Sequence, residues 1–561
     1  MVVFKSQQPP IDLPTNLTDW DWLFDSKYSP INHHPPNELN GFQNALTKER
    51  VTWANVKTFS TYISTALVTR YGLREQDTIS LFSQNTVWYP VAMFAGLRVG
   101  ARISGASPAY NVEEMTFALK TANAKFLMTT PGSLDVARRS AEAAGMPRRN
   151  VFLLEGEVPG YTSVHELIEM GRAFGEGDQT PAFKIPQGKE NKDVCGFLSF
   201  SSGTTGLPKA VMISHQNVIA QCLQIQQITP KSHKKVMAVL PLFHITGLVH
   251  QMHLPILLNA EVVMLPQFTM EGMLDTIVEY QLTELLLVPP ILIRLVRDPV
   301  VDRYDLSHVQ RFSSGAAPLS EEIIQLLQKK FPNTGFKQGY GMTESCSCIT
   351  AHPPEKYSYK YAHSGGAICA STEVKILKED GTEGDVGEQG EVLARGPQVV
   401  MGYLDNEKAT KETFDEDGFL HTGDQGLIDE EGMIHITDRI KELIKVKGIG
   451  VAPAELEDLL LGHAKVEDVA VMGIPDEYSG ELPKAFVKLK ASVQADTAVG
   501  RELIAFVKEK KVRHKWIKEI EFIPEIPKSA SGKILRRVLR DEEKSGKNPS
   551  VVVKDAPQAK L

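Results

Sequence analysis

The chain has 561 residues and a formal net charge of −8, with acidic and basic side chains interspersed along it. This length exceeds what one ordinary hydrophobic core supports, so we expect two or more domains. The lack of a basic block argues against a nucleic-acid-binding protein, and no stretch reaches the roughly 18 uninterrupted apolar residues that a membrane span needs.

Up to about residue 430, short apolar runs typical of buried strands alternate with helical stretches. The clearest runs are VFLLEG (151–156), KVMAVLPL (235–242), EVVMLPQF (261–268) and LTELLLVPP (282–290). Apolar strands that alternate with helices are typical of an α/β domain with a largely buried sheet. The sequence therefore predicts a large N-terminal α/β domain.

From Thr372 the pattern changes to short strands joined by turns rich in glycine and aspartate. TEVKILKEDG (372–381), GEQGEVLARGP (387–397) and GMIHITDR (432–439) show this pattern. Short strands bounded by such turns predict a β-rich subdomain at the end of the N-terminal domain.

Beyond residue 438 the pattern is that of a compact α+β segment. A helical pattern at 454–463 is followed by strand patterns at 466–476 and 481–490. The whole chain is therefore predicted to be an α/β multi-subdomain protein. We expect an N-terminal domain over 1–438, a small mobile α+β domain over 439–540 and a polar tail over 541–561.

The five cysteines form no recognisable metal or disulfide pattern; they are Cys195, Cys222, Cys346, Cys348 and Cys369. They show no Cys-x-x-Cys pair and no ligand set nearby, which fits a reducing compartment inside the cell. We expect the closely spaced pair at 346 and 348 to line a pocket rather than to carry redox chemistry.

Residues 198–209, LSFSSGTTGLPK, combine glycines and hydroxyl side chains with one lysine directly after an apolar run. Glycines allow backbone N–H groups to converge, hydroxyls add donors and Lys209 adds positive charge, a combination suited to holding a polyphosphate. The spacing of a Walker A loop is absent. On composition alone, a flexible Ser/Thr/Gly loop is the alternative.

Six further motifs follow this loop along the chain. They are LPLFHITG (240–247), SGAAP (314–318), GYGMTES (339–345), HTGD (421–424), DRIKELIKVKG (438–448) and PKSASGKILRR (527–537). In this order and spacing, the seven motifs resemble those of the adenylate-forming (AMP-binding, acyl-CoA synthetase) superfamily. The chain most resembles its 4-coumarate–CoA ligase and luciferase branch, from about Asp19 to Arg537.

The resemblance implies that a carboxylic acid attacks the α-phosphate of ATP and becomes an acyl-adenylate. The negative charge that gathers on the phosphoryl oxygens needs cations and oriented donors. The residues that match the triphosphate and nucleotide positions of the family are Ser201, Ser202, Gly203, Thr204, Thr205, Lys209, Ala316, Gln338, Gly339 and Tyr340. Tyr340 stands between glycines, so its ring can lie flat on adenine.

Four further positions match the family's adenylation residues. Thr343 offers a donor to the α-phosphate and Glu344 a hard oxygen ligand for Mg²⁺, although the same pair could simply begin a helix. Asp424 matches the carboxylate that accepts hydrogen bonds from both ribose hydroxyls, with Arg439 beside it; taken alone, Asp424 would be a turn aspartate. Lys533 matches the lysine that bridges the acid and the α-phosphate.

A second half-reaction with coenzyme A is implied, for which the C-terminal domain rotates about a hinge. Lys441 matches the hinge position. Lys445, Lys447 and Gly448 match the face that contacts AMP and lines the CoA tunnel. His244 matches a residue between the acid pocket and this tunnel, and a satisfied core histidine is the alternative for it.

The acid pocket is expected to be walled by small residues, namely Thr246, Gly315, Gly341, Ser347 and Cys348. Such walls suggest a deep slot for a medium-chain aliphatic or an aryl-alkanoic acid. Two positions depart from the coumarate ligases: Gly450 replaces a glutamine that contacts AMP, and Gln267 replaces a lysine that contacts CoA. Both departures concern the thioester step and leave the adenylation residues intact.

The chain ends in Ala559-Lys560-Leu561, after a polar stretch. A small residue, a basic residue and leucine at the end resemble the SKL-type address that a peroxisomal import receptor reads, although the match could be a coincidence. We therefore expect the peroxisome as the location and the import receptor as a partner.

Together the motifs predict a peroxisomal acid–CoA ligase that uses ATP, Mg²⁺ and coenzyme A on a small-molecule carboxylic acid. Three alternatives share some of these motifs. They are a luciferase-like oxygenase, a stand-alone adenylation enzyme that loads a carrier protein, and a non-catalytic nucleotide-binding protein. Because we expect no fused carrier domain, the second is disfavoured, and the complete set of adenylation residues disfavours the third.

Overall fold

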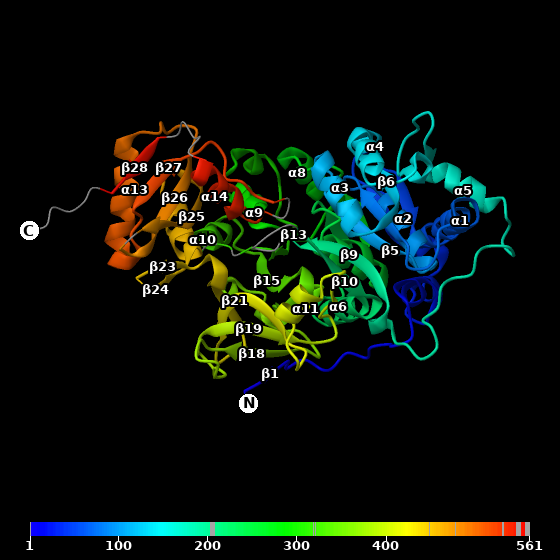
Figure 1. The fold of residues 1–561 in the computed structure, drawn as a ribbon, viewed down its shortest axis with the longest axis horizontal. Helices are drawn as coiled ribbons and strands as arrows, with labels where there is room; N and C mark the ends of the chain where they lie inside the picture. Colours follow the sequence, from blue (N-terminus) through cyan, green and yellow to red (C-terminus); the bar gives the residue numbers. More distant parts are fainter. Residues whose placement is uncertain are drawn as a thin grey trace, which may run out of the picture.

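The computed structural model describes residues 2–201, 208–317, 319, 321–447, 449–476, 478–529, 532–545 and 551–555. Within these residues the N-terminal part, coloured blue to yellow in Figure 1, carries four sheets. The C-terminal domain, orange to red, lies at one end of the molecule with a sheet of its own (Figure 1). The predicted α/β fold with a β-rich subdomain and a small C-terminal domain is confirmed.

The largest sheet has eight strands in the order β20-β10-β9-β5-β4-β6-β7-β8. The bounds are β20 (Gly402–Tyr403), β10 (Lys209–Ser214), β9 (Cys195–Ser201), β5 (Arg102–Ala106), β4 (Thr78–Phe82), β6 (Ala124–Thr129), β7 (Val151–Leu153) and β8 (Thr162–Ser163). From β9 to β8 the strands are parallel, whereas β10 runs antiparallel to β9 and β20. Every residue of β4 is buried, as expected for a parallel strand with helices on both faces.

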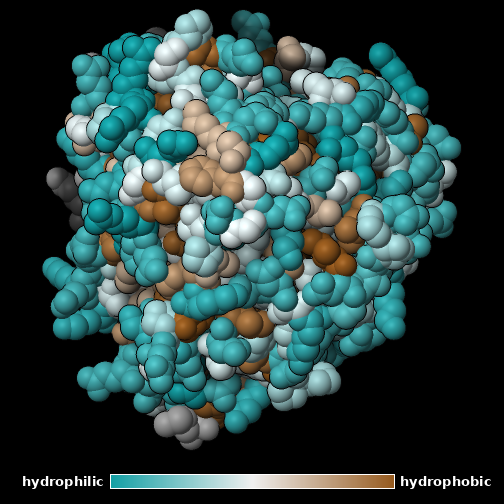
Figure 2. Space-filling view, turned by 90° about the vertical axis from the view of Figure 1, so that its right-hand side faces the viewer, coloured by the Kyte–Doolittle hydropathy of each residue, from teal (hydrophilic) through white to brown (hydrophobic). Residues whose placement is uncertain are grey.

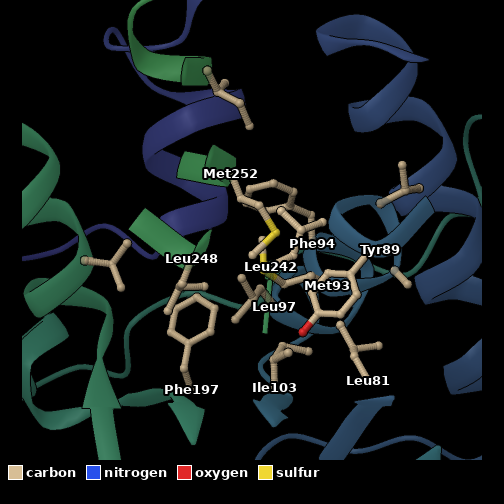
Figure 3. Close-up of a cluster of buried hydrophobic side chains, with 14 of the residues drawn as sticks. Leu81, Tyr89, Met93, Phe94, Leu97, Ile103, Phe197, Leu242, Leu248 and Met252 are labelled. Atoms are coloured by element: carbon tan, nitrogen blue, oxygen red, sulfur yellow. The ribbon is translucent and has the colours of Figure 1, made fainter. Parts of the chain in front are cut away.

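The helices that pack on this sheet are α2 (Trp88–Arg98), α3 (Val112–Thr121), α4 (Leu134–Ala143) and α5 (Val164–Arg172), and α1 (Trp53–Tyr71) packs on α2 and α5. Helix α2 is buried along its whole length. Its side chains Met93, Phe94 and Leu97 meet Phe197 of β9 and Met252 in the core shown in Figure 3. This packing fixes the end of β9, where the predicted phosphate loop begins.

Two smaller sheets form the middle of the N-terminal domain. The first has the order β11-β12-β2-β3 and the second β13-β14-β15-β16-β17. Their bounds are β11 (Lys235–Ala238), β12 (Glu261–Met264), β2 (Gly41–Asn44), β3 (Arg50–Thr52), β13 (Glu284–Leu287), β14 (Arg311–Ser314), β15 (Gly335–Met342), β16 (Ser347–Ala351) and β17 (Ala367–Ile368). Strands β13, β14 and β15 are parallel, so their carboxyl ends meet at one edge, where α/β sheets commonly bind ligands.

The helical elements of this middle region connect its strands. They are α6 (His215–Gln227), the π-helical segment η7 (Gly247–His253), α7 (Leu254–Leu257), α8 (Met270–Tyr280), α9 (Pro289–Arg297) and α10 (Glu321–Lys330). The short 3-10 segment η9 (Thr343–Ser345) follows β15 directly. Strand β15 and η9 therefore carry the GYGMTES motif from the middle sheet to its edge.

The β-rich subdomain is an antiparallel sheet in the order β1-β18-β19-β21-β22. Its strands are β1 (Phe4–Lys5), β18 (Glu373–Leu377), β19 (Gly390–Arg395), β21 (Leu420–Ile428) and β22 (Ile434–Arg439), and α11 (Glu407–Thr413) precedes β21. Buried and less buried residues alternate strictly along β21, the pattern of a strand with one face on a core.

The C-terminal domain folds around its own hydrophobic core of buried valine, leucine and isoleucine side chains. Its elements are β23 (Ile444–Val446), β24 (Ile449–Val451), α12 (Pro453–Leu461), β25 (Val466–Asp476), β26 (Gly480–Leu489), α13 (Thr497–Lys510), β27 (Glu519–Phe522), α14 (Arg536–Ser545) and β28 (Val552–Lys554). A domain with its own core can turn as a unit.

The prediction that a polar tail begins at residue 541 is wrong. Helix α14 continues to Ser545, and β28 pairs with β27 at the edge of the C-terminal sheet. Asp555 then forms ion pairs with Lys508 and Lys518, at 2.5 and 3.1 Å. The chain up to residue 555 is therefore part of the domain, whereas the predicted address at 559–561 lies outside the described residues.

The surface offers no sign of a lipid-spanning segment in the part of the chain that the structure describes. None of its helices combines the length and hydropathy needed to cross a bilayer. On the face shown in Figure 2, hydrophilic side chains dominate and hydrophobic ones gather only in small separate groups. Such scattered apolar groups are ordinary on a folded surface.

Candidate active site

A cavity of about 880 Å³ opens between the edges of the N-terminal sheets and the C-terminal domain. Its walls include residues from all six motifs that follow the phosphate loop, and both described ends of that loop. Lys209, Thr343 and Glu344 line it from the N-terminal domain, and Lys441 and Lys533 line it from the other side. The fold thus brings together residues that lie more than 300 positions apart, since 533 − 209 = 324.

The ends of the phosphate loop meet at one wall of the cavity. The antiparallel register of β9 and β10 pairs Ser201 with Lys209, so both residues stand where the loop leaves the sheet. The predicted phosphate-binding residues Ser202, Gly203, Thr204 and Thr205 lie outside the described residues, as does Gly448. The ammonium of Lys209 lies 4.8 Å from the ring centre of Tyr403, which keeps this charge at the cavity wall.

Glu344 is a buried carboxylate held by a tyrosine. The hydroxyl of Tyr403 donates a hydrogen bond to Glu344 Oε1 at 2.9 Å, and both side chains line the cavity. Burial raises the pKa of Tyr403, and the neighbouring carboxylate of Glu344 raises it further, so the tyrosine remains a donor. One carboxylate oxygen is thereby anchored, which leaves the other for a ligand in the cavity.

Asp424, Arg439 and Tyr340 form a second polar group beside the cavity. Strands β21 and β22 pair Asp424 with Arg439, whose Nε lies 3.2 Å from Asp424 Oδ1. Tyr340 donates to Asp424 Oδ2 at 2.8 Å. Burial raises the pKa of Asp424, and the guanidinium of Arg439 opposes that rise. The arrangement presents an oriented carboxylate next to a cation, as the predicted ribose contact requires.

Lys533 reaches the cavity from a tight turn of the C-terminal domain. Ser529 and Lys533 bond to each other across this turn, with Lys533 N donating to Ser529 Oγ at 3.1 Å. Burial lowers the pKa of Lys533 to about 8, and Arg439 lowers it further, whereas Asp424 and Glu344 oppose the shift. The lysine is therefore mostly charged at neutral pH and stands among the groups predicted to hold the nucleotide.

Gly532 allows this turn to rest on the N-terminal domain. Its φ of +82° is in the left-handed region, and a Cβ there would lie 2.8 Å from Cδ of Pro290 in helix α9. A side chain at this position would therefore meet both backbone strain and a steric clash. The glycine in the motif SGK thus positions Lys533 against the cavity.

The five predicted wall residues of the acid pocket all line the cavity; they are Thr246, Gly315, Gly341, Ser347 and Cys348. A Cβ on Gly341 would lie 1.7 Å from the carbonyl oxygen of Ser347, so β15 and β16 approach too closely for any side chain there. His244 also lines the cavity, and burial lowers its pKa to about 4, with a further contribution from Lys533. It is a neutral imidazole at the cavity wall near Lys533.

Some predicted residues lie apart from this site. Lys445 and Lys447 are exposed and do not belong to the described residues that line the cavity. Gln338 is buried and donates to the backbone carbonyl of Ala362 instead. Ala316 does line the cavity, with an unusual φ of +71° for a residue with a side chain. Gly450 and Gln267, the two positions that differ from the coumarate ligases, are exposed.

Sequence reasoning missed several charged and polar residues of the cavity, which are His233, His250, Glu284, Lys337 and Tyr403. Two of them carried a signal. Glu284 is a charge inside the apolar run LTELLLVPP, and such a residue needs a partner when the strand is buried. Lys337 stands two residues before Gly339, so strand periodicity puts both on one face.

The metal prediction rests on Glu344 alone. Among the described residues, no group of three or more histidine, cysteine, aspartate or glutamate side chains has the geometry of a metal site. A lone carboxylate is nevertheless compatible with Mg²⁺, because this ion is commonly held by one or two carboxylates, phosphate oxygens and water.

Comparison with known proteins agrees with the motifs. The family model of the AMP-binding enzymes matches residues 39–404, and that of the AMP-binding enzyme C-terminal domain matches residues 455–533. 4-Coumarate–CoA ligase 1 of Petroselinum crispum is 34% identical over 558 residues, which cover 98% of each chain.

Solved structures show the same fold. The anthranilate CoA ligase AuaEII in complex with anthranoyl-AMP has a TM-score of 0.83 at 24% identity and covers 95% of this chain and 99% of its own. The o-succinylbenzoate–CoA synthetase of Bacillus subtilis in complex with ATP and magnesium has a TM-score of 0.76 at 25% identity and covers 94% and 100%. The chain therefore belongs to the AMP-binding family of adenylate-forming enzymes, and it is an acid–thiol ligase akin to the 4-coumarate–CoA ligases.

Proposed function

We propose that this ligase joins an aryl-alkanoic or medium-chain acid to coenzyme A in two steps, through an acyl-adenylate, and releases AMP and pyrophosphate. The observation that carries the proposal is the position of Lys533. Its ammonium enters the cavity from the C-terminal domain and stands within electrostatic reach of Glu344, Asp424 and Arg439. A cation at this junction can hold an acid carboxylate and a phosphate together against their mutual repulsion.

The residues present fit ATP and Mg²⁺. Positive charge from Lys209, Arg439 and Lys533 surrounds the part of the cavity where the triphosphate would lie. Glu344 offers one carboxylate oxygen that is not held by Tyr403. Bound there, Mg²⁺ would neutralise phosphate charge. Arg439 and Asp424 would meanwhile orient the ribose, and Lys533 would hold the acid in line with the α-phosphate.

The thioester step requires a different position of the C-terminal domain. Lys445 and Lys447, whose family counterparts serve that step, face away from the cavity in this arrangement. Lys441 lies at the cavity between the two domains, where a hinge residue belongs. These positions support a rotation that withdraws Lys533 and brings the second face to the adenylate.

The alternatives are less well supported. A luciferase-like oxygenase or a carrier-loading enzyme would share the adenylation residues, but the relative that covers nearly the whole chain is named a CoA ligase. We also propose that the enzyme acts in the peroxisome, on the strength of Ala559-Lys560-Leu561. A fluorescent fusion that loses its punctate distribution when these three residues are deleted would support this location, and an unchanged distribution would refute it.

The function is tested by AMP release from ATP and Mg²⁺ across a panel of carboxylic acids, with and without CoA. Mass spectrometry of the products distinguishes the adenylate from the thioester. The proposal expects CoA-dependent thioester formation with aryl-alkanoic or medium-chain acids. Acid-dependent adenylate without a thioester would contradict it, and would direct attention to Gly450, Gln267 and a different acceptor.

A further inference from the structure

The acid-binding part of the cavity ends in charged and polar side chains instead of a closed apolar end. We call His233, Glu284, Ser313 and Lys337 the polar floor, since all four line the cavity. They come from the loop before β11 and from the three parallel strands β13, β14 and β15. A pocket for a plain hydrocarbon tail would not need them, because buried polar groups cost stability unless they find partners.

The polar floor lies at the opposite end of the cavity from the adenylation residues. Lys337 is near the start of β15, whereas Thr343 and Glu344 follow the end of that strand. Six residues of strand separate Lys337 from Thr343, which corresponds to about 20 Å. The pKa shifts of two histidines agree with this separation, since the charge of Lys533 lowers the pKa of His244 and the charge of Lys337 lowers that of His250. An acid held by Lys533 therefore points its tail toward Lys337.

The charges at the polar floor do not cancel once Arg311 is counted with it. Arg311, which lies behind the floor, pairs closely with Glu284, with its Nη2 2.9 Å and its Nε 3.0 Å from Oε2. The ammonium of Lys337 is 3.5 Å from Glu284 Oε1, a longer contact. One carboxylate thus faces two cations. Burial lowers the pKa of His233 and lowers that of His250 to about 3, so neither imidazole adds charge near neutral pH. The group carries one net positive charge.

Lys337 keeps its proton in this setting. Burial works against the ammonium, but the carboxylate of Glu284 outweighs it and holds the pKa of Lys337 above its ordinary value. An ammonium has three donors, and the contact to Glu284 uses one of them. The ring of Tyr357, whose centre is 5.5 Å from the ammonium nitrogen, shields part of the other two donors.

One further polar atom of the floor has no hydrogen-bond partner within the described ranges. It is Nδ1 of His233, which lies 3.5 Å from Glu284 Oε2. Ser313 donates to Glu284 Oε1 at 3.1 Å, the same carboxylate oxygen that Lys337 contacts. Gly315 and Gly339 add no side chain between Lys337 and the rest of the pocket, so a ligand there meets the ammonium of Lys337.

We propose that the acid carries an oxygen acceptor, a carboxylate or a hydroxyl, at the end of its tail, and that Lys337 donates to it. This inference rests on the proposed function, since it assigns the substrate class of the same site. The net positive charge favours a carboxylate over a hydroxyl, because charge-assisted hydrogen bonds are about twice as strong as neutral ones. Acids that end in a bare hydrocarbon leave the ammonium with its contacts to Glu284 and Tyr357 alone.

The test compares matched acids: phenylpropionate with its para-hydroxy and para-carboxy derivatives, and octanoate with octanedioate. We expect kcat/KM for acyl-CoA formation to be at least about tenfold higher for an oxygen-tipped acid than for its hydrocarbon counterpart. The hydroxyl and carboxylate arms identify which acceptor the site takes. Equal or better use of the plain acids would overturn the inference, whereas activity with none of the panel would refute the proposed function instead.

Lys337→Met removes the ammonium and keeps a side chain of similar length. We expect the ratio of kcat/KM between each oxygen-tipped acid and its plain partner to fall toward one. Lys360→Met is the matched control, because this lysine is 71% exposed and pairs with Glu431 away from the cavity. If Lys337→Met folds poorly, Lys337→Gln tests the same preference with a neutral side chain that keeps polar atoms for its neighbours. A preference that survives both substitutions would overturn the inference.

Discussion

Tyr403 is expected to act as a positioning residue for the predicted magnesium ligand. Its hydroxyl donates to Glu344 at 2.9 Å, and the two residues are only 7% and 4% exposed. The substitution Tyr403→Phe removes this hydroxyl and keeps the ring that Lys209 covers at 4.8 Å. The change therefore isolates one hydrogen bond to a buried carboxylate.

The magnitude follows from the chemistry of that bond. A hydrogen bond to a charged group contributes about 1.5–3 kcal/mol, and each 1.4 kcal/mol is tenfold in an equilibrium. Partners that orient a metal ligand typically change affinity or activity by about 10- to 100-fold when removed. We therefore expect the apparent Mg²⁺ affinity in the adenylation half-reaction, or its rate at saturating Mg²⁺, to fall by about 10- to 100-fold.

The assay is acid-dependent pyrophosphate exchange titrated with Mg²⁺, followed by the thioester step from preformed adenylate as a second readout. Tyr71→Phe is the matched control, because its hydroxyl lies 3.1 Å from Thr162 Oγ1 far from the cavity. If Tyr403→Phe matched the wild type within about twofold in both Mg²⁺ affinity and exchange rate, the reasoning about Glu344 would be refuted.

Three other predictions concern the adenylation half-reaction. Because the pKa of Lys533 is lowered to about 8, kcat/KM for adenylation should fall as pH rises through about 8, where the ammonium loses its proton. Lys533→Arg should shift this decline to higher pH. A pH profile that stays flat to high pH would exclude the role of Lys533 in adenylation. Gly532→Ala should slow adenylation about tenfold or more, because the Cβ of the new alanine would clash with Pro290. The conversion of preformed adenylate to the thioester should change less. Asp424→Asn should raise KM for ATP about tenfold, since both the ion pair with Arg439 and the expected contact to the ribose weaken. An unchanged KM for ATP would contradict the assignment of Asp424 to the ribose.

The fold and the motif residues that line the cavity were predictable because their signals are local. Each motif places small, hydroxyl or charged residues at a fixed spacing, and the sheets bring the ends of those motifs to one cavity. Strand periodicity also indicated the buried sheet and the alternating subdomain strand β21. Such patterns depend on neighbours in the chain rather than on distant packing.

The parts that could not be predicted depend on distant partners. Residues 552–554 read as part of a polar tail, but pairing with β27 makes them a strand, since strand formation follows its packing context. The polar floor likewise arises only when β13, β14 and β15 lie side by side. Nothing in the local sequence joins Lys337 to Glu284, which lies 53 residues earlier and 3.5 Å away.

The contacts between the two domains are compatible with the rotation that the thioester step needs. Arg297 of α9 donates to the backbone carbonyl of Leu461 at 3.0 Å, and Ala454 N donates to Asp438 at 3.1 Å beside the proposed hinge. Such polar, partly exposed contacts each stabilise an arrangement by about 1 kcal/mol or less, so a bound nucleotide can shift the balance. With Lys533 at the cavity and Lys445 exposed, this arrangement fits the adenylation step that we propose. If the proposed rotation takes place, we expect the consequences of Gly450 and Gln267 in the other arrangement, where the thioester would form.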